Sequence, residues 1–227
     1  MKIKVLITLL SFSISAFAQT KPEVPKKLFI INSYREYLVS VKANPNNMLV
    51  EIKKAIPNIK LDIRYATKNN FMKQVMYGQS RAFARRPVVE SLKNVQAELN
   101  KQGLGLKIFD GYRPYTITVA FYKKASDKNF VANPNQGSKH NRGCAVDLTI
   151  INLKTGKEIP MPTPYDSFSA AAAANYPNVS VEVKKNRDFF IAIMKKYKLN
   201  VLENEWWHYD FQGWQNYALM DIPFEKL

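Results

Sequence analysis

The chain has 227 residues, of which 46% are hydrophobic and 12% aromatic, and these values are typical of a globular protein. Its single cysteine, Cys144, excludes an internal disulfide, so stability must come from packing. A formal charge of +16 also occurs in nucleic-acid-binding proteins, but the lysines are spread along the chain in pairs without a nucleic-acid motif. We expect a solvated basic surface and no nucleic-acid partner.

Residues 1–18 have the features of a secretory signal peptide. Two lysines precede an apolar run from Val5 to Phe12, and the segment ends in Ala16-Phe17-Ala18, as signal peptides do before their cleavage site. The apolar run is shorter than the ~20 residues that a membrane span needs. We therefore expect cleavage after Ala18, export to the periplasm or the medium, and no membrane span afterwards.

The rest of the chain fits a single domain. Residues 19–45 are mostly polar and contain three prolines, and we expect a flexible lead-in with one short strand near Tyr37 to Val41. Residues 46–227 form the predicted domain. It begins with a short helix from Met48 that ends before Pro57. Alternating polar and apolar residues from Lys60 to Tyr65 then indicate a half-buried strand.

Two helices and one strand are predicted next. Arg86-Pro87 begins a helix that ends at Gly103 and whose apolar residues keep helical spacing, namely Val88, Leu92, Val95 and Leu99. The alternating residues from Leu104 to Ile108 indicate a strand that leads to Asp110-Gly111-Tyr112-Arg113-Pro114. A second helix follows from about Thr116 to Ala125, and then a Gly-, Asn- and Pro-rich loop from Asp127 to Gly143.

The last third of the chain predicts further strands and one helix. Cys144 to Ile151 indicates a strand, and Lys154 to Lys157 turns it into a hairpin whose partner ends near Met161. After a long loop, a core helix is expected from about Lys184, and Glu205 to Phe211 closes the sheet. Hairpins mixed with separate helices predict an α+β fold with a central antiparallel sheet and flanking helices.

The chain has only two histidines, His140 and His208, and each lies in a polar-aromatic cluster near a predicted strand. A lone histidine is more often a structural residue than a metal ligand. With Asp147, however, the two form the set that a catalytic zinc site uses, which is two imidazoles, a carboxylate and a fourth position for water. A metal in such a site lowers the pKa of its water and stabilises an oxyanion.

Strand geometry supports this set. Ala145, Asp147 and Thr149 share one face of the predicted strand, so Asp147 can meet His140 arriving from the preceding loop, at the face of the sheet. Gly143 supplies the backbone freedom for that approach. Cys144 faces the other side, and we interpret it as a small buried residue and not as a thiolate ligand.

Glu205 and Arg113 are the other candidates for chemistry. Glu205 stands three residues before His208 and can act as a general base, but residues three apart in a regular strand face opposite sides, so a bend or bulge at Trp206 is required. Arg113 can either pair with Asp110 at the surface or stabilise an oxyanion in the site. Spacing alone does not decide between these two roles.

Three motifs together resemble one family. They are Asp110-Gly111-Tyr112-Arg113-Pro114, Ser138-x-His140-x-x-Gly143-x-Ala145-x-Asp147 and Glu205-Trp206-Trp207-His208, with a further match from Asp62 to Phe71. In this order they are similar to the D-alanyl-D-alanine dipeptidases, a branch of the zinc D-Ala-D-Ala peptidases of the cell wall. The resemblance covers about Leu61 to Asp210.

The resemblance implies a zinc peptidase catalytic domain over residues 46–227 that acts on a small D,D-dipeptide. It also implies the site residues. One zinc ion per chain is bound by His140, Asp147 and His208. Glu205 acts as the base and Arg113 stabilises the transition state, while the dipeptide ends are recognised by Ser138, Tyr65 and Asp166, with Asp166 facing the ammonium.

Pro162 departs from the family pattern, which commonly has glycine there. Proline fixes φ and removes an N–H, so the pocket shape and the strict preference for a free dipeptide stay open. One alternative is a peptidoglycan D,D-carboxypeptidase or endopeptidase with the same ligands and an open groove, although Trp206 and Trp207 favour the dipeptidase branch. A second alternative is a zinc-stabilised binding protein without catalysis, against which Glu205 and Arg113 count. The sequence does not indicate an oligomeric state.

Overall fold

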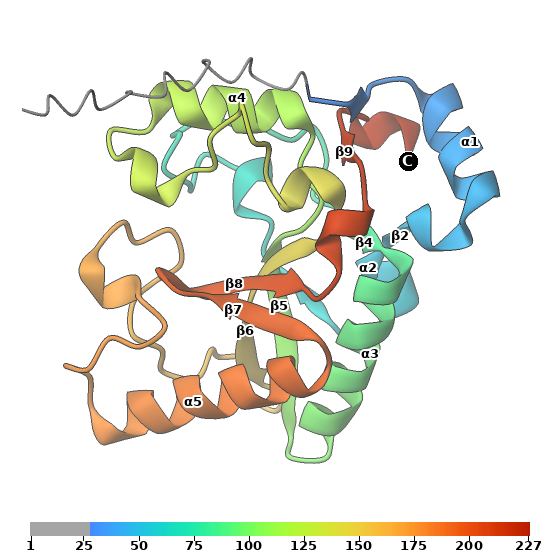
Figure 1. Cartoon of the computed structure of the whole chain (residues 1–227). Helices are drawn as coiled ribbons and strands as arrows, with labels where there is room; N and C mark the ends of the chain where they lie inside the picture. Colours follow the sequence, from blue (N-terminus) through green and yellow to red (C-terminus); the bar gives the residue numbers. More distant parts are fainter. Residues whose placement is uncertain (1–27) are drawn as a thin grey trace, which may run out of the picture.

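The computed structural model describes residues 28–227. A five-stranded sheet with the order β3-β5-β6-β8-β7 lies at its centre (Figure 1). Its strands are Lys60–Leu61 (β3), Leu104–Asp110 (β5), Ala145–Asn152 (β6), Glu205–Phe211 (β8) and Leu199–Leu202 (β7). All neighbouring strands run antiparallel except β3 and β5, which are parallel. The predicted α+β class with a central, mainly antiparallel sheet is confirmed.

The longest helices pack against this sheet (Figure 1). Helix α3 is Arg86–Asn100 and packs on β5, while α5 is Val181–Lys196 and packs on β7. The four predicted apolar positions of α3 are all fully buried, as one face of an amphipathic helix should be. Beyond its end Gly103 has φ +70°, a conformation that glycine adopts without steric cost.

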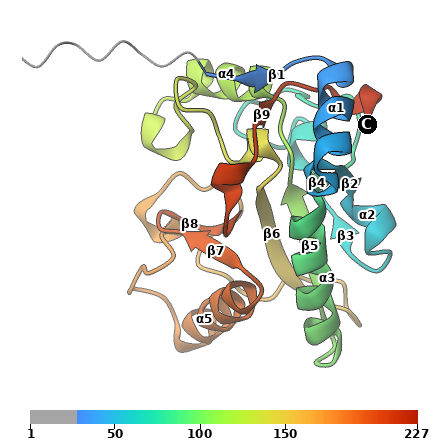
Figure 2. The same ribbon diagram turned by 45° about the vertical axis from the view of Figure 1, so that its right-hand side comes forward.

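Smaller elements surround the sheet (Figure 2). Helices α1, α2 and α4 are Tyr34–Ala43, Ile52–Ala55 and Tyr115–Lys124. Strands Ile30–Ile31 (β1) and Leu219–Met220 (β9) form a parallel pair, and Leu49–Glu51 (β2) and Phe83–Arg85 (β4) form an antiparallel pair. Short 3₁₀ turns are Pro45–Asn47, Arg64–Ala66, Lys128–Phe130, His140–Arg142, Ala170–Ala172, Trp214–Asn216 and Phe224–Lys226.

The structure corrects the prediction for the N-terminal segment. The signal peptide at residues 1–18 and the start of the lead-in fall outside the described residues. The strand predicted at Tyr37 to Val41 is wrong, since these residues belong to α1. Ser33 caps this helix by accepting a hydrogen bond from the Glu36 N–H, and the buried Tyr37 hydroxyl accepts one from the Leu49 N–H at 2.8 Å. Helix α1 is therefore fixed to the domain and is not a flexible lead-in.

Three further predictions need revision. The strand from Lys60 is paired only at two residues and then turns into a 3₁₀ helix. The hairpin after β6 reduces to one bridge between Ile151 and Glu158. Strand β7 was missed, so β8 lies inside the sheet and does not close it. Within residues 28–227 no helix is long and apolar enough to cross a membrane.

Candidate metal centre and its pocket

The register of three adjacent strands brings acidic and imidazole side chains together. Asp110 on β5 is paired with Asp147 on β6, and Asp147 is paired with His208 on β8. Directly opposed residues of neighbouring strands point to the same face of a sheet. Asp147 therefore lies on that face between a second carboxylate and an imidazole.

His140 reaches the same place from the 3₁₀ turn His140–Arg142. Gly143 ends this turn with φ +68°, and a Cβ there would lie 2.7 Å from the Leu49 side chain. The backbone freedom predicted for Gly143 is thus required by both conformation and space. The His140 carbonyl accepts a hydrogen bond from the Arg113 N–H at 3.1 Å, which fixes the turn against the motif that carries Arg113.

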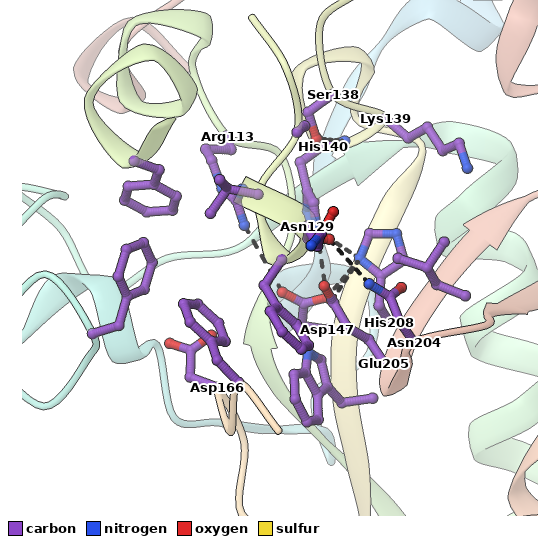
Figure 3. A pocket seen from close by; sticks show the side chains of 18 of the residues that line it. Arg113, Asn129, Ser138, Lys139, His140, Asp147, Asp166, Asn204, Glu205 and His208 are labelled. Carbon is purple, nitrogen blue, oxygen red and sulfur yellow. Dashed lines mark hydrogen bonds and ion pairs between the residues drawn. The ribbon is translucent and has the colours of Figure 1, made fainter. Parts of the chain in front are cut away.

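The side chains of His140, Asp147 and His208 point toward one another (Figure 3). Asp147 Oδ1 lies 3.4 Å from His140 Nε2 and 3.1 Å from His208 Nδ1, and the two nitrogens are 3.2 Å apart. Tetrahedral zinc with bonds of about 2.0–2.1 Å separates its ligand atoms by roughly 3.3 Å. The three atoms therefore form one face of a tetrahedron of the size that zinc needs.

The hydrogen bonds of the two imidazoles show which nitrogens are free. His140 Nδ1 lies 2.7 Å from the Gly111 carbonyl and His208 Nε2 lies 2.9 Å from Asp210 Oδ1, so both nitrogens must carry the proton and donate. In the neutral imidazoles, His140 Nε2 and His208 Nδ1 are then left with lone pairs, and the two nitrogens face each other at 3.2 Å. Such partners behind a histidine ligand set its tautomer and its basicity.

The two carboxylate oxygens of Asp147 differ in their hydrogen bonding. Its Oδ2 accepts a hydrogen bond from the Tyr165 hydroxyl at 3.0 Å. Its Oδ1 is buried, and among residues 28–227 nothing donates a hydrogen bond to it. A buried acceptor without a donor costs free energy. Three acceptors that converge on one point need a positive charge between them, and two imidazoles with one carboxylate suit zinc.

The electrostatics of the cluster favour the same conclusion. Burial acts to lower the pKa of His208, but the adjacent Asp147 and Asp210 carboxylates outweigh burial and raise the pKa to about 10. Burial also acts to raise the pKa of Asp147, yet the adjacent imidazoles hold it well below its ordinary value. The cluster thus attracts a positive charge, which is a proton in the metal-free protein.

Glu205 lies beside this cluster because β8 is irregular. Val201 pairs with Tyr209, yet the next residue, Leu202, pairs with Glu205. The predicted bulge around Trp206 is therefore present. It places Glu205 Oε2 3.8 Å from His208 Nδ1. Burial raises the pKa of Glu205 to about 7, against the opposing effect of His208, which suits a group that takes up and releases a proton near neutrality.

Arg113 pairs with Asp110, and its guanidinium also reaches the cavity. Its Nε and Nη2 atoms lie 3.0 and 2.8 Å from Asp110 Oδ2, but the pair is buried and not at the surface. Nη2 is also 3.9 Å from Asp147 Oδ2, and the guanidinium lines the cavity. Burial opposes its charge, but Asp110 raises the pKa of Arg113 above its ordinary value. The site therefore holds a fixed cation.

The cluster opens into a cavity of about 290 Å³ that all three predicted substrate-binding residues line; Ser138 and Asp166 are labelled in Figure 3. The Tyr65 hydroxyl donates to both carboxylate oxygens of Asp166 at 3.1 Å. Burial and the charge of Asp147 raise the pKa of Asp166 to about 8. Ser138 Oγ accepts a hydrogen bond from the His140 N–H at 3.2 Å, and Pro162 is not among the residues that line the cavity.

Two residues of the site were not predicted from sequence. Asp210 follows His208 by two residues in β8 and so shares its face, a signal that strand alternation could have revealed. Tyr165 reaches Asp147 from an irregular loop, and no local pattern indicated it. Cys144 is buried with its thiol pKa raised by burial to about 12, in agreement with the structural role expected for it.

Three ligand atoms beside a carboxylate and a buried cation define a metal-dependent hydrolase, and comparison with known proteins gives the family. The chain belongs to the D-ala-D-ala dipeptidase family, peptidase M15, whose sequence pattern matches residues 45–224. It is therefore a zinc metallopeptidase.

Relatives of known function align with most of this chain. The D-alanyl-D-alanine dipeptidase of Escherichia coli (strain K12) is 27% identical over 176 residues, which is 78% of this chain and 91% of that protein. The enzyme of the same name from Enterococcus faecium is 28% identical over 177 residues, covering 68% and 86%. Among solved structures, the LdcB LD-carboxypeptidase is 20% identical with a TM-score of 0.39, covering 59% of this chain and 61% of that one.

Proposed function

We propose that this protein hydrolyses D-Ala-D-Ala to free D-alanine and binds one zinc ion per chain through His140, Asp147 and His208. The observation that carries the proposal is the buried Asp147 Oδ1, which has no hydrogen-bond donor among the described residues and faces two imidazole lone pairs. The family of the chain and its curated relatives support the substrate.

The reaction needs a polarised carbonyl, a base and an acid. A zinc ion held by this cluster would polarise the scissile carbonyl and make water more acidic. Glu205 takes the proton from the attacking water and gives it to the leaving nitrogen as the C–N bond breaks. The Arg113 guanidinium, held in place by Asp110, stabilises the negative charge that develops on the carbonyl oxygen.

The far end of the cavity suits the substrate ammonium. Burial and the charge of Asp147 raise the pKa of Asp166, and the neutral Tyr65 hydroxyl and the charge of Arg113 do not offset them. A substrate ammonium would supply a further positive charge and restore ionisation. Ser138, beside the metal ligand His140, lies where it can contact the dipeptide near the scissile bond (Figure 3).

A contact between two loops supports a free dipeptide over a longer peptide. Asn204 in the β7–β8 turn donates from Nδ2 to the Asn129 carbonyl at 3.1 Å, and both residues line the cavity. This bond joins two segments of the pocket lining that are distant in sequence (Figure 3). It limits the room for a peptide that extends beyond two residues.

We also propose that the enzyme is exported, on the basis of the signal-peptide features of residues 1–18. An exported enzyme would meet dipeptides released from the cell wall and not cytoplasmic precursors. Cell fractionation with N-terminal sequencing tests this proposal, and a cytoplasmic protein that keeps Met1 to Ala18 would contradict it.

The decisive experiment pairs metal analysis with a turnover assay on free D-Ala-D-Ala and on a cell-wall pentapeptide ending in D-Ala-D-Ala. We expect one zinc per chain, hydrolysis of the dipeptide and little cleavage of the pentapeptide. Asp147→Asn should lose both zinc and activity. The exposed Asp188, paired with Lys184, provides the control Asp188→Asn, which should keep both. Zinc-loaded protein without dipeptide turnover would refute the proposal.

A further inference from the structure

An aromatic wall lies next to the carboxylate that would hold the substrate ammonium. Phe168 follows Asp166 by two residues and stacks on Phe130, with ring centroids 5.0 Å apart and planes at 7°. Phe71 contacts Phe168 at 5.1 Å and meets the Tyr65 ring edge-on at 6.2 Å. Three separate chain segments thus bring their phenyl rings to one end of the cavity.

These rings are not simply part of the core. Phe71, Phe130 and Phe168 are each only partly buried, and all three line the cavity. Their neighbour Phe121 contacts Phe71 at 5.0 Å but is buried at 2% exposure, as a core residue should be. The wall therefore leaves apolar surface directed into the cavity, where a ligand can cover it.

The position of the wall specifies which part of a substrate reaches it. The amino nitrogen and the first side-chain carbon of a residue are both bonded to Cα and lie roughly 2.5 Å apart. A dipeptide with its ammonium at Asp166 would therefore hold its first side chain at the end of the cavity that the wall lines. A methyl group covers little of three phenyl rings, whereas a larger apolar side chain covers more and gains binding free energy.

We infer that Phe71, Phe130 and Phe168 form a specificity subsite for the first residue, and that the enzyme prefers D,D-dipeptides with a bulkier apolar first residue over D-Ala-D-Ala. This inference rests on the proposed function, since it needs a dipeptide with its ammonium at Asp166. The second residue lies on the other side of the scissile bond and should show no such preference.

The test compares kcat/KM for D-Ala-D-Ala, D-Leu-D-Ala and D-Ala-D-Leu. Burying part of a leucine side chain against the wall should raise kcat/KM about 3- to 10-fold for D-Leu-D-Ala relative to D-Ala-D-Ala. The change should fall mainly on KM, because the apolar contact is the same in the ground state and the transition state. D-Ala-D-Leu should show no increase.

Substitutions in the wall test whether it causes the preference for a bulkier first residue. Phe168→Ala should bring the ratio of D-Leu-D-Ala to D-Ala-D-Ala to 1 or below, and Phe130→Ala, which changes a different segment, serves if Phe168→Ala fails to fold. The exposed Phe29, which does not line the cavity, gives the control Phe29→Ala, which should keep the wild-type ratio. A wild-type enzyme that rejects D-Leu-D-Ala, or a ratio unchanged in both wall variants, overturns the inference. Failure to cleave any dipeptide with zinc bound refutes the proposed function instead.

Discussion

Asp210→Asn tests how the residues behind a ligand control the metal site. Asp210 accepts hydrogen bonds on both carboxylate oxygens, at 2.9 Å from His208 Nε2 and at 2.5 Å from Lys139 Nζ. Asparagine has one oxygen and one NH₂ group. If the oxygen faces His208, the NH₂ group meets the lysine ammonium, and both are donors. If the amide turns over, His208 Nε2 must accept, and the proton moves to Nδ1, where the metal should bind.

Either orientation weakens zinc binding. Loss of such a partner typically costs 10- to 100-fold in metal affinity, which equals about 1.4–2.7 kcal/mol. Lys139→Met removes the competing donor, so the amide oxygen of the double variant can face His208. We therefore expect Asp210→Asn with Lys139→Met to bind zinc more tightly than Asp210→Asn alone, which is a coupling that a double-mutant cycle measures.

Competition with a chromogenic chelator gives the zinc dissociation constant of each variant, and turnover is measured with the site saturated. Glu158, which pairs with Lys107 at 2.5 Å and contacts no histidine, provides the control Glu158→Gln. That variant should keep wild-type zinc affinity. A dissociation constant within twofold of wild type in Asp210→Asn, or a double variant that binds no better than the single one, would show that this reasoning is wrong.

Three further changes test the base, the cluster and its support. Glu205→Gln should lower kcat/KM about 10²- to 10⁴-fold with unchanged zinc content, and near-normal turnover would exclude Glu205 as the base. In the metal-free protein the pKa of His208 is raised to about 10, so protonated His208 stabilises the fold. This contribution to the free energy of unfolding is complete below about pH 6.5 and is lost as the pH rises through 10. The melting temperature should fall over that window, unlike that of the zinc-bound protein, and equal pH profiles for the two forms would contradict it. Gly111→Ala places a Cβ 2.6 Å from the Phe83 carbonyl and should destabilise the fold by about 1–3 kcal/mol. It should also weaken zinc binding by moving the carbonyl that orients His140, and wild-type affinity would refute that link.

Sequence patterns predicted the elements whose periodicity was strong. Helix α3 and strand β5 lie where the apolar spacing and Gly103 placed them. The group of metal-binding side chains could also be predicted, because two histidines and one aspartate in compact motifs leave few other choices of ligand. Helix α1 was missed because this short helix depends on a cap at Ser33 and on the contact between Tyr37 and Leu49, and the second of these is a tertiary interaction.

Contacts from irregular loops could not be predicted. The Tyr165 hydroxyl holds Asp147, and the Phe130–Phe168 stack lines the cavity, yet all three aromatic residues lie in segments without helical or strand periodicity. Their positions depend on packing between loops that are distant in sequence. The sequence likewise left the role of Arg113 open, because it did not show that the pair with Asp110 is buried beside the cavity.

The two tryptophans before His208 explain why the bulge and the pocket occur together. Trp206 and Trp207 are both buried, and a bulge lets consecutive large side chains find separate places in the core. Trp206 Nε1 donates to Thr163 Oγ1 at 3.0 Å, and the Trp207 ring meets Tyr165 edge-on at 5.6 Å. Both contacts hold the loop that carries Asp166. The irregularity that brings Glu205 to the metal ligands thus also fixes the loop proposed to recognise the substrate ammonium, so a change at either tryptophan should affect the base and the substrate pocket together.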